Sequence, residues 1–433
     1  MIPRLPSYVL LFLSMVSARA YGQTGIDSTL FGDWDGSITV QGMKLTIHTH
    51  FVEDQATIDI PQQGAQGLPL QNVSSDGDIV HFELPAGPGL AVFDGNMDGD
   101  TIAGTFSQAG ANGSFTLARS GAAPTASQMD PDSGPEGEPV AVETSTGTLH
   151  GSLVVPETPG PWPMVVLVSG SGPTDRDGNT VGLPGKNNSL LLLAEALREN
   201  GIASIRYDKR GIGESVMPVA ESDLRIDSFA VDAASWARLA LADGRFSHVF
   251  LAGHSEGALL VSMAATKVDV AGVITIAGAG RPASALLKEQ LAAQLPANLM
   301  TQADSIIASL LGGETVRDVP QPLMAIFRPS VQPYLISWFK RDPAQVLARV
   351  KRPKLIAQGE TDIQVSVADA KRLAAASPDA KLSIIPGMNH VLKDVPADRA
   401  KQVASYSDPS LPVDATLVSE VARFVKEVTA GGQ

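Results

Sequence analysis

The sequence predicts an α/β protein in which a mostly parallel sheet, covered by helices on both faces, follows a small antiparallel β-domain. Beyond residue 138, short apolar runs alternate with amphipathic segments of helical length, which is typical of parallel strands joined by helices. Before residue 119, short runs of alternating polarity are separated by turn residues, which is typical of antiparallel strands. The change from one pattern to the other predicts a domain boundary.

The composition excludes several classes of protein. Of the 433 residues, 44% are hydrophobic and 18% charged, which is enough to bury a large core and excludes a wholly disordered chain. The net charge of −14 argues against nucleic acid as a partner and against electrostatic attachment to anionic lipid. The chain has no cysteine, so disulfides, thiolate metal sites and cysteine nucleophiles are excluded. Any covalent nucleophile must be another residue type.

Residues 1–20 contain the three parts of a signal peptide in order. Arg4 gives a short positive start, residues 8–16 are apolar, and Ala18-Arg19-Ala20 fits a small-x-small cleavage site. The apolar run is too short to span a bilayer, which needs about 20 residues; a short helix or a membrane anchor is the alternative interpretation. No later run is long enough to cross a membrane. We therefore expect an exported protein, periplasmic or secreted, with no integral membrane segment after cleavage.

Residues 21–119 are predicted to form an antiparallel sandwich or small barrel. Asp-Gly pairs, which favour tight turns, begin at Asp35, Asp76, Asp94 and Asp98. Strands are expected at residues 37–40, 44–47, 56–60, 79–84 and 101–106. The early Gly-Asp-Trp at residues 32–34 is similar to the start of lipocalin-type barrels, and a ligand-binding barrel and a structural appendage both stay open. Residues 120–137, rich in Ala, Pro, Ser, Gly and acids, are predicted to be a linker.

Two features of the β-domain contain part of a metal site. In residues 94–100, oxygen-bearing side chains and a glycine have the spacing of a calcium-binding loop. Position 12 of such a loop is Thr105 here rather than Glu, and expected strands flank the loop. We therefore predict a hairpin turn there. His48 and His50 lie on one face of an expected strand, but no third ligand is evident. We expect neither a metal nor a cofactor.

Residues 138–429 alternate between strands and helices. The run at residues 164–168 is apolar throughout, as in a strand buried on both faces. Helices are expected at residues 188–199 and 229–242, and further strands at 202–207, 249–252, 273–277, 355–358 and 382–385. The alternation stops at about residues 281–352, which are mostly helical in pattern. We predict that this stretch is an insertion over the carboxyl edge of the sheet.

The chemistry is predicted to lie where the strands end. Gly253-His254-Ser255-Glu256-Gly257 follows one strand and begins a helix, the context in which Gly-x-Ser-x-Gly marks a serine nucleophile on a sharp turn. The alternative is a serine that only caps the helix. The glycines leave room where the turn brings two backbones together. We expect His254 to point away from Ser255 and to be structural.

A serine hydroxyl needs a base, and the chain order expected for this motif is serine, acid, histidine. His390 is the one histidine after Ser255, and it lies just beyond the last clear strand. The acid should follow the preceding strand, where Glu360 and Asp362 both occur. Asp362 is our assignment and Glu360 the alternative. The acid would orient the imidazole and stabilise the imidazolium.

These residues resemble those of bacterial α/β-hydrolases of the serine carboxylesterase type, close to a branch also called acyl-peptidase-like. The resemblance covers about residues 138–429. It rests on residues 168–179, 206–215, 253–257, 359–362 and 387–390. It implies the α/β-hydrolase fold with a helical cap. A β-domain ahead of the catalytic domain is similar to the arrangement in some esterases of this branch.

The resemblance also implies roles for neighbouring residues. Ser171 and Glu256 would donate their amides to the oxyanion, although this chain has Ser-Gly at 169–170 where the superfamily commonly has His-Gly, so the first donor lies within one residue of Ser171. We expect residues 175–177 to pair internally, with substrate contact as the alternative, and Asp208 and Arg210 to brace nearby loops. Residues of the cap would form either its own core or an acyl pocket. The pocket candidates are Met324, Phe327, Tyr334, Trp338 and Phe339.

Three functions fit these residues. The first is hydrolysis of small-molecule carboxylic esters, of short to medium acyl chain, through an acyl-enzyme. The second is a peptidase acting on short acylated peptides; its large relatives carry a β-propeller, which about 95 residues cannot build. The third is a non-enzymatic binding protein that uses its β-domain, against which the intact Ser, Asp and His argue. The natural substrate and the oligomeric state, a homo-oligomer included, stay open.

Overall fold

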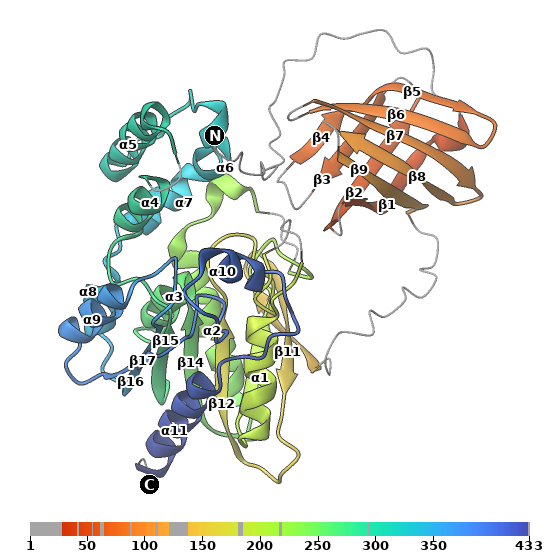
Figure 1. The fold of residues 1–433 in the computed structure, drawn as a ribbon. Coiled ribbons are helices and arrows are strands. Elements are labelled where there is room, and N and C mark those ends of the chain that lie inside the picture. The colour runs from red at the N-terminus through yellow and green to blue at the C-terminus, as the bar shows by residue number, and fades with distance from the viewer. Residues whose placement is uncertain are drawn as a thin grey trace. The chain divides into compact units, whose positions relative to one another are not determined.

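The computed structural model describes most of the chain, which packs into two units (Figure 1). The described residues are 28–40, 43–53, 55–60, 65–86, 89–108, 111–120, 137–180, 185–215, 219–292 and 295–431. Residues 1–131 with 182–184 make up the first unit, and residues 132–181 with 185–433 the second. The predicted signal peptide at residues 1–20 and nearly all of the predicted linker at 120–137 lie outside the described residues.

The first unit is a barrel-like antiparallel sheet with the strand order β4-β3-β2-β1-β9-β8-β7-β6-β5. Alternate residues face its interior, where Phe82 and Phe93 stack and Phe115 meets both rings edge-on. The Trp34 indole is fully buried and donates a hydrogen bond to the Leu30 carbonyl. Aromatic side chains therefore fill the interior. The strands are β1 Gly32–Val40, β2 Met43–Val52, β3 Gln55–Ile60, β4 Ala65–Pro69, β5 Gln71–Asp76, β6 Ile79–Ala86, β7 Gly89–Asp98, β8 Thr101–Gln108 and β9 Ala111–Arg119.

Two of the four Asp-Gly pairs form turns and two do not. The pairs at Asp76 and Asp98 lie at the turns after β5 and β7, so the hairpin predicted within residues 94–100 is confirmed. The turns predicted at Asp35 and Asp94 are wrong, because those residues lie inside β1 and β7. A Cβ on Gly36 would lie 1.8 Å from the Thr116 carbonyl oxygen. That glycine is needed for close packing of neighbouring strands rather than for a turn.

The two histidines considered as metal ligands lie on the outer face of this sheet. Nδ1 of His48 is 2.5 Å from Oδ1 of Asp35, and His50 makes the matching contact with Asp33. A hollow of about 280 Å³ lies beside these side chains. Within the described ranges, the structure holds no group of three or more such side chains arranged for a metal ion.

The second unit is built on an eight-stranded sheet with the order β10-β11-β13-β12-β14-β15-β16-β17. The first two pairings are antiparallel and the rest are parallel. The predicted α/β class with a mostly parallel sheet is confirmed. The strands are β10 Glu138–Thr144, β11 Gly147–Val154, β12 Trp162–Val168, β13 Ala203–Tyr207, β14 Phe246–His254, β15 Gly272–Ile276, β16 Lys354–Gly359 and β17 Lys381–Ile385.

Helices cover both faces of this sheet because its strands are apolar on both sides (Figure 1). In β12, Val165 and Leu167 pack in one core, with α1 and α11. Met164, Val166 and Val168 pack in the other, with α2 and α3. The helices outside the region between β15 and β16 are α1 Ser189–Glu199, α2 Ile226–Ala242, α3 Glu256–Ala264, α9 Val367–Ala376, α10 Arg399–Ser405 and α11 Ala415–Gly431. No described helix is both long enough and apolar enough to pass through a bilayer.

Between β15 and β16 the chain is mostly helical. Several of these helices bury a separate apolar core that includes Phe327 and Phe339. This segment follows the carboxyl end of β15, and its helices α4 to α7 gather at one end of the sheet (Figure 1). We call residues 281–352 the cap. Its helices are α4 Ala283–Ala292, α5 Ala297–Gly312, α6 Met324–Phe327, α7 Gln332–Phe339 and α8 Pro343–Ala348.

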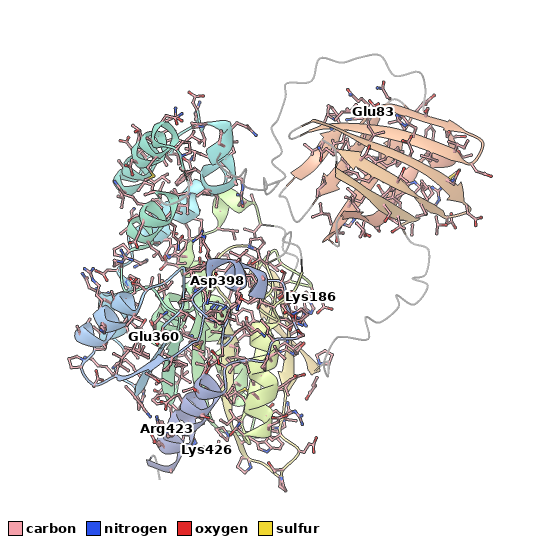
Figure 2. The ribbon with its side chains drawn as sticks, viewed as in Figure 1. Glu83, Lys186, Glu360, Asp398, Arg423 and Lys426 are labelled. Atoms are coloured by element: carbon pink, nitrogen blue, oxygen red, sulfur yellow. The ribbon has the colours of Figure 1, made fainter. Side chains whose placement is uncertain are left out.

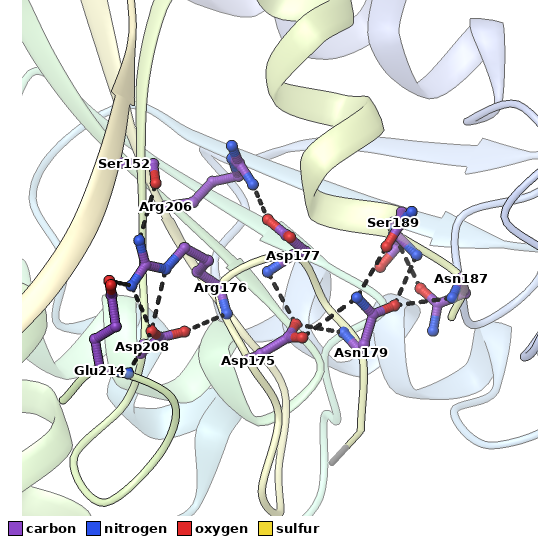
Figure 3. A network of polar contacts seen from close by, with 11 residues as sticks. Ser152, Asp175, Arg176, Asp177, Asn179, Asn187, Ser189, Arg206, Asp208 and Glu214 are labelled. Atoms are coloured by element: carbon purple, nitrogen blue, oxygen red, sulfur yellow. Dashed lines mark hydrogen bonds and ion pairs between the residues drawn. The ribbon is translucent and has the colours of Figure 1, made fainter. Parts of the chain in front are cut away.

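A network of charged groups joins the loops that follow β12 and β13 (Figure 3). Arg176 donates to the Asp208 carboxylate at 2.6 Å and also contacts Glu214. Asp177 pairs with Arg206. The predicted internal pairing of residues 175–177 is therefore wrong, because their charged partners come from the strand and loop beside them. The bracing role predicted for Asp208 is confirmed.

Arg210 is also confirmed as a brace, and it links the loop after β13 to helix α2. It makes two hydrogen bonds of 2.5 Å to the carboxylate of Asp232, and both side chains are buried. Asp227 forms a similar pair with Arg341 near the start of the same helix, but there both side chains are more than a third exposed. The two pairs therefore differ in burial rather than in chemistry.

We predict that Asp232→Asn lowers the free energy of unfolding by about 3–5 kcal/mol, because it leaves the Arg210 charge buried without a counter-ion. The control Asp227→Asn should cost less than about 1 kcal/mol, because solvent screens an exposed pair. Urea denaturation of the full chain at pH 7 measures both. Equal losses in the two variants would contradict the role given to burial.

Candidate active site

Ser255 lies on a sharp turn between β14 and α3. Its φ is 55° and ψ is −116°, a left-handed conformation that is unfavourable for a non-glycine residue. Its side chain makes no capping hydrogen bond to the helix, so the structure does not favour the simple capping role. The turn holds the hydroxyl at the carboxyl edge of the parallel strands, next to the positive end of the α3 dipole.

The two glycines of the motif allow this turn to form. A Cβ on Gly253 would lie 2.0 Å from the carbonyl oxygen of Gly257, and a Cβ on Gly257 would lie 2.3 Å from that of Val168. Both contacts are with backbone, which cannot move aside as a flexible side chain would. Gly170, in the loop after β12, is also closely packed, but against side chains: its Cβ would lie 3.2 Å from the Cβ of Ser255. The β12 loop therefore lies directly against the candidate nucleophile.

The structure brings His390 and Asp362 together. Nδ1 of His390 is 2.8 Å from Oδ2 of Asp362, and both side chains are buried. Glu360, the alternative acid, is exposed to solvent (Figure 2). Asp362 also accepts hydrogen bonds from the amides of Gln364 and Val365, at 2.7 and 2.9 Å.

Burial alone would raise the pKa of Asp362, but its partners outweigh that effect. The charge and hydrogen bond of His390, together with the two backbone amides, hold the pKa of Asp362 below its ordinary value. The group is therefore an anion at neutral pH. An anion at Nδ1 keeps the proton on that nitrogen and leaves Nε2 free to accept one.

His254 connects the serine turn to the loop that carries His390. Its Nε2 donates to the carbonyl oxygen of His390 at 2.8 Å, and the two ring centroids lie 4.9 Å apart. Burial, and next the neighbouring His390, lower the pKa of His254 to about 3, so this ring is neutral. The structural role predicted for His254 thus has a definite partner. Among the described contacts there is no direct hydrogen bond between Ser255 and His390; such bonds are often long before substrate binds.

The two amides predicted to form an oxyanion site flank Ser255. Glu256 is the first residue of α3, so its N–H has no acceptor within the helix. Ser171 follows Gly170 in the loop that packs on Ser255. Neither amide donates to another backbone group among the described residues. Both are therefore free to donate to a bound oxyanion.

The sequence does not predict a cluster of side chains that lies beside these amides. The carboxylate of Glu256 accepts a hydrogen bond of 2.5 Å from the Tyr334 hydroxyl and lies 3.7 Å from Nζ of Lys209. Lys209 also donates to the carbonyl oxygen of Gly170. The sequence predicts a role only for the amide of Glu256. The one signal available was a charged Lys within Tyr-Asp-Lys-Arg directly after a buried strand.

The five pocket candidates occupy different surroundings. Phe327 and Phe339 are buried in the core of the cap. Tyr334 faces Glu256 and packs against Phe229 and Trp338, while Met324 and Trp338 are partly buried. A hollow of about 280 Å³ in this unit lies elsewhere, beside Arg281 and Asp369.

Comparison with known proteins shows which family and which esterase this chain is similar to. Residues 182–394 match the family described as serine aminopeptidase, S33. The esterase EstD from Thermotoga maritima is 28% identical over 286 residues, which are 64% of this chain and 65% of that protein. The match therefore spans less than two thirds of that relative's length.

Two solved structures of esterases are also similar. Est1E from Butyrivibrio proteoclasticus has 17% identity and a TM-score of 0.45, covering 67% of this chain and 99% of that one. A thermophilic esterase from Thermogutta terrifontis has 18% identity and a TM-score of 0.42, with coverage of 67% and 99%. The second unit of this chain has the α/β-hydrolase fold and is similar, over residues 182–394, to the S33 serine aminopeptidase family and also to the esterase from Thermotoga maritima.

Proposed function

We propose that this protein is a serine hydrolase that cleaves small-molecule carboxylic esters of short to medium acyl chain. The observation that carries the proposal is the hydrogen bond from His254, the residue before Ser255 on its glycine-lined turn, to the backbone of His390, whose ring pairs with the buried Asp362. The sequence similarity to an esterase supports ester rather than amide bonds as substrates. The predicted signal peptide supports an exported location, periplasmic or secreted.

The reaction follows from the roles that these groups can take. Ser255 Oγ attacks the ester carbonyl while its proton passes to Nε2 of His390. The carbonyl oxygen becomes an oxyanion that accepts hydrogen bonds from the amides of Ser171 and Glu256. The C–O bond to the alcohol then breaks, and His390 gives the proton to the leaving alkoxide.

Water completes the cycle. His390 takes a proton from a water molecule, whose oxygen attacks the acyl-enzyme at the same carbonyl carbon. The second tetrahedral intermediate collapses by breaking the bond to Ser255 Oγ, which recovers the proton from His390. The product is a carboxylic acid. Throughout, Asp362 stays ionised and orients the imidazole.

A peptidase acting on short peptides is the second candidate, favoured by the description of the matching family as serine aminopeptidase. It would use the same three side chains. The first unit is a single antiparallel sheet, which is not a propeller of four or more blades. The size filter of the large acyl-peptidases therefore has no counterpart in the described part of this chain.

The first test compares p-nitrophenyl esters from acetate to palmitate. We expect the unaltered protein to favour short and medium chains and Ser255→Ala to lose activity by ~10⁶, because the nucleophile is gone. A dipeptide amide assayed beside the esters separates the two candidates. Equal rates in the two proteins would overturn the proposal, and faster cleavage of the amide would favour the peptidase.

The second test concerns the acid. Asp362→Asn should lower kcat by ~10⁴, because an amide favours the wrong tautomer of His390. Glu360→Gln is the matched control: it removes a carboxylate two residues away, and kcat should stay within about threefold. Steady-state kinetics on the best ester measures both. A loss in the Glu360 variant alone would reverse the assignment of the acid.

A further inference from the structure

Three loops meet beside Ser255 because their strands are neighbours in the sheet. Strand β12 pairs with β13 on one side and with β14 on the other. Lys209 lies two residues beyond the end of β13, Gly170 two residues beyond the end of β12, and Glu256 two residues beyond the end of β14. Because all three strands are parallel, these residues come together at one edge. Contacts among these three residues are therefore contacts within the candidate oxyanion site.

Lys209 makes two contacts at this junction. Its Nζ donates to the carbonyl oxygen of Gly170 and lies 3.7 Å from Oε1 of Glu256. Only 4% of the Lys209 side chain and 2% of the Glu256 side chain are exposed. The second carboxylate oxygen accepts from the Tyr334 hydroxyl, which belongs to α7 of the cap. The cluster thus joins both oxyanion loops to the cap.

A buried ion pair is a weak source of net stability, because desolvation of the two charges offsets their attraction. Burial lowers the pKa of Lys209, and the nearby Glu256 carboxylate opposes that effect. Its position beside the nucleophile is therefore better explained by what the ammonium orients than by stability. The group that it orients is the peptide between Gly170 and Ser171.

We infer that Lys209 is a positioning residue that aims the Ser171 N–H at the oxyanion of the proposed ester reaction. In a trans peptide group, the carbonyl and the N–H point in opposite directions across one rigid plane. By holding the Gly170 carbonyl, Lys209 fixes the direction of the Ser171 N–H. Its positive charge also polarises the peptide and makes that N–H a stronger donor.

The same cluster positions the other donor. The side chain of Glu256 is held by Lys209 and Tyr334, while its own amide is the second oxyanion N–H. Tyr334 is therefore the residue through which the cap contacts the oxyanion site. This inference rests on the proposed function, since an oxyanion forms only if Ser255 attacks a carbonyl.

The test compares two variants with a matched control. Lys209→Met removes the ammonium, and Lys209→Met/Glu256→Gln removes both buried charges, so the interior is left without an unpaired ion. Lys354→Met is the control: Lys354 is also buried, and its Nζ donates to the Val350 carbonyl at 2.9 Å and pairs with Asp379. It begins β16 and so lies at the opposite end of the sheet.

Both Lys209 variants should lower kcat by ~10²-fold, the scale of a lost oxyanion donor, with KM changed less than about threefold. Affinity for a trifluoromethyl ketone, which forms a tetrahedral adduct with the serine, should fall by the same factor as kcat/KM. Lys354→Met should keep the kcat and the ketone affinity of the unaltered protein. Far-UV circular dichroism and urea denaturation check that each variant is folded.

The inference is overturned if the folded double variant keeps the kcat and the ketone affinity of the unaltered protein, or if only KM changes. The rate of labelling by a fluorophosphonate separates this failure from failure of the proposed function. If the unaltered protein is labelled but hydrolyses no ester, the ester proposal fails, and the relative labelling rates of the variants decide the role of Lys209. If the unaltered protein is not labelled, both fail.

Discussion

The close approach of Gly257 to the end of β12 is the constraint on which the site depends. A side chain at this position would meet the carbonyl oxygen of Val168 at 2.3 Å. Only a glycine lets α3 begin directly against the neighbouring strand, and this packing places the Ser255 turn beside the β12 loop. The Ser255 turn and the amides proposed for the oxyanion are thus set by backbone packing, before any side chain is considered.

Charged side chains then fix loops that backbone packing alone would leave adjustable. Asp208 receives Arg176 from the preceding loop, and Asp232 receives Arg210 from the strand end beside it. Asp362 collects four donors, among them the imidazole of His390 and the amide of Gln358. Asp208 and Asp362 each accept hydrogen bonds from more than one segment, and Asp232 accepts two from Arg210. A buried carboxylate without hydrogen-bond donors costs free energy. The donors that come to these carboxylates from nearby loops therefore hold those loops in one arrangement.

Local patterns in the sequence were enough to predict the parallel strands and the residues at their ends, because apolar runs and Gly-x-Ser-x-Gly are local signals. They failed where the answer depends on strand pairing. Gly36 and Gly95 looked like turn residues, yet they face close neighbours within a sheet. The partners of Arg176, and the contact of Tyr334 with Glu256 across 78 residues of sequence, likewise follow from tertiary structure. A short stretch of sequence does not show which distant residue a side chain contacts.

The cap has a consequence for how such a protein can change over evolution. The buried apolar residues of α4 to α7 form a core of their own, whereas Ala344 and Leu347 of α8 pack in one of the two cores of the sheet. Substitutions in distinct cores are close to additive in their effects on stability. Helices α4 to α7 can therefore be remodelled by successive mutations without disturbing the sheet. Tyr334 and Trp338 are exceptions, since both pack with a core of the sheet as well as with the core of α4 to α7, and Tyr334 also contacts Glu256. Such remodelling is thus least constrained at positions of α4 to α7 far from these two residues.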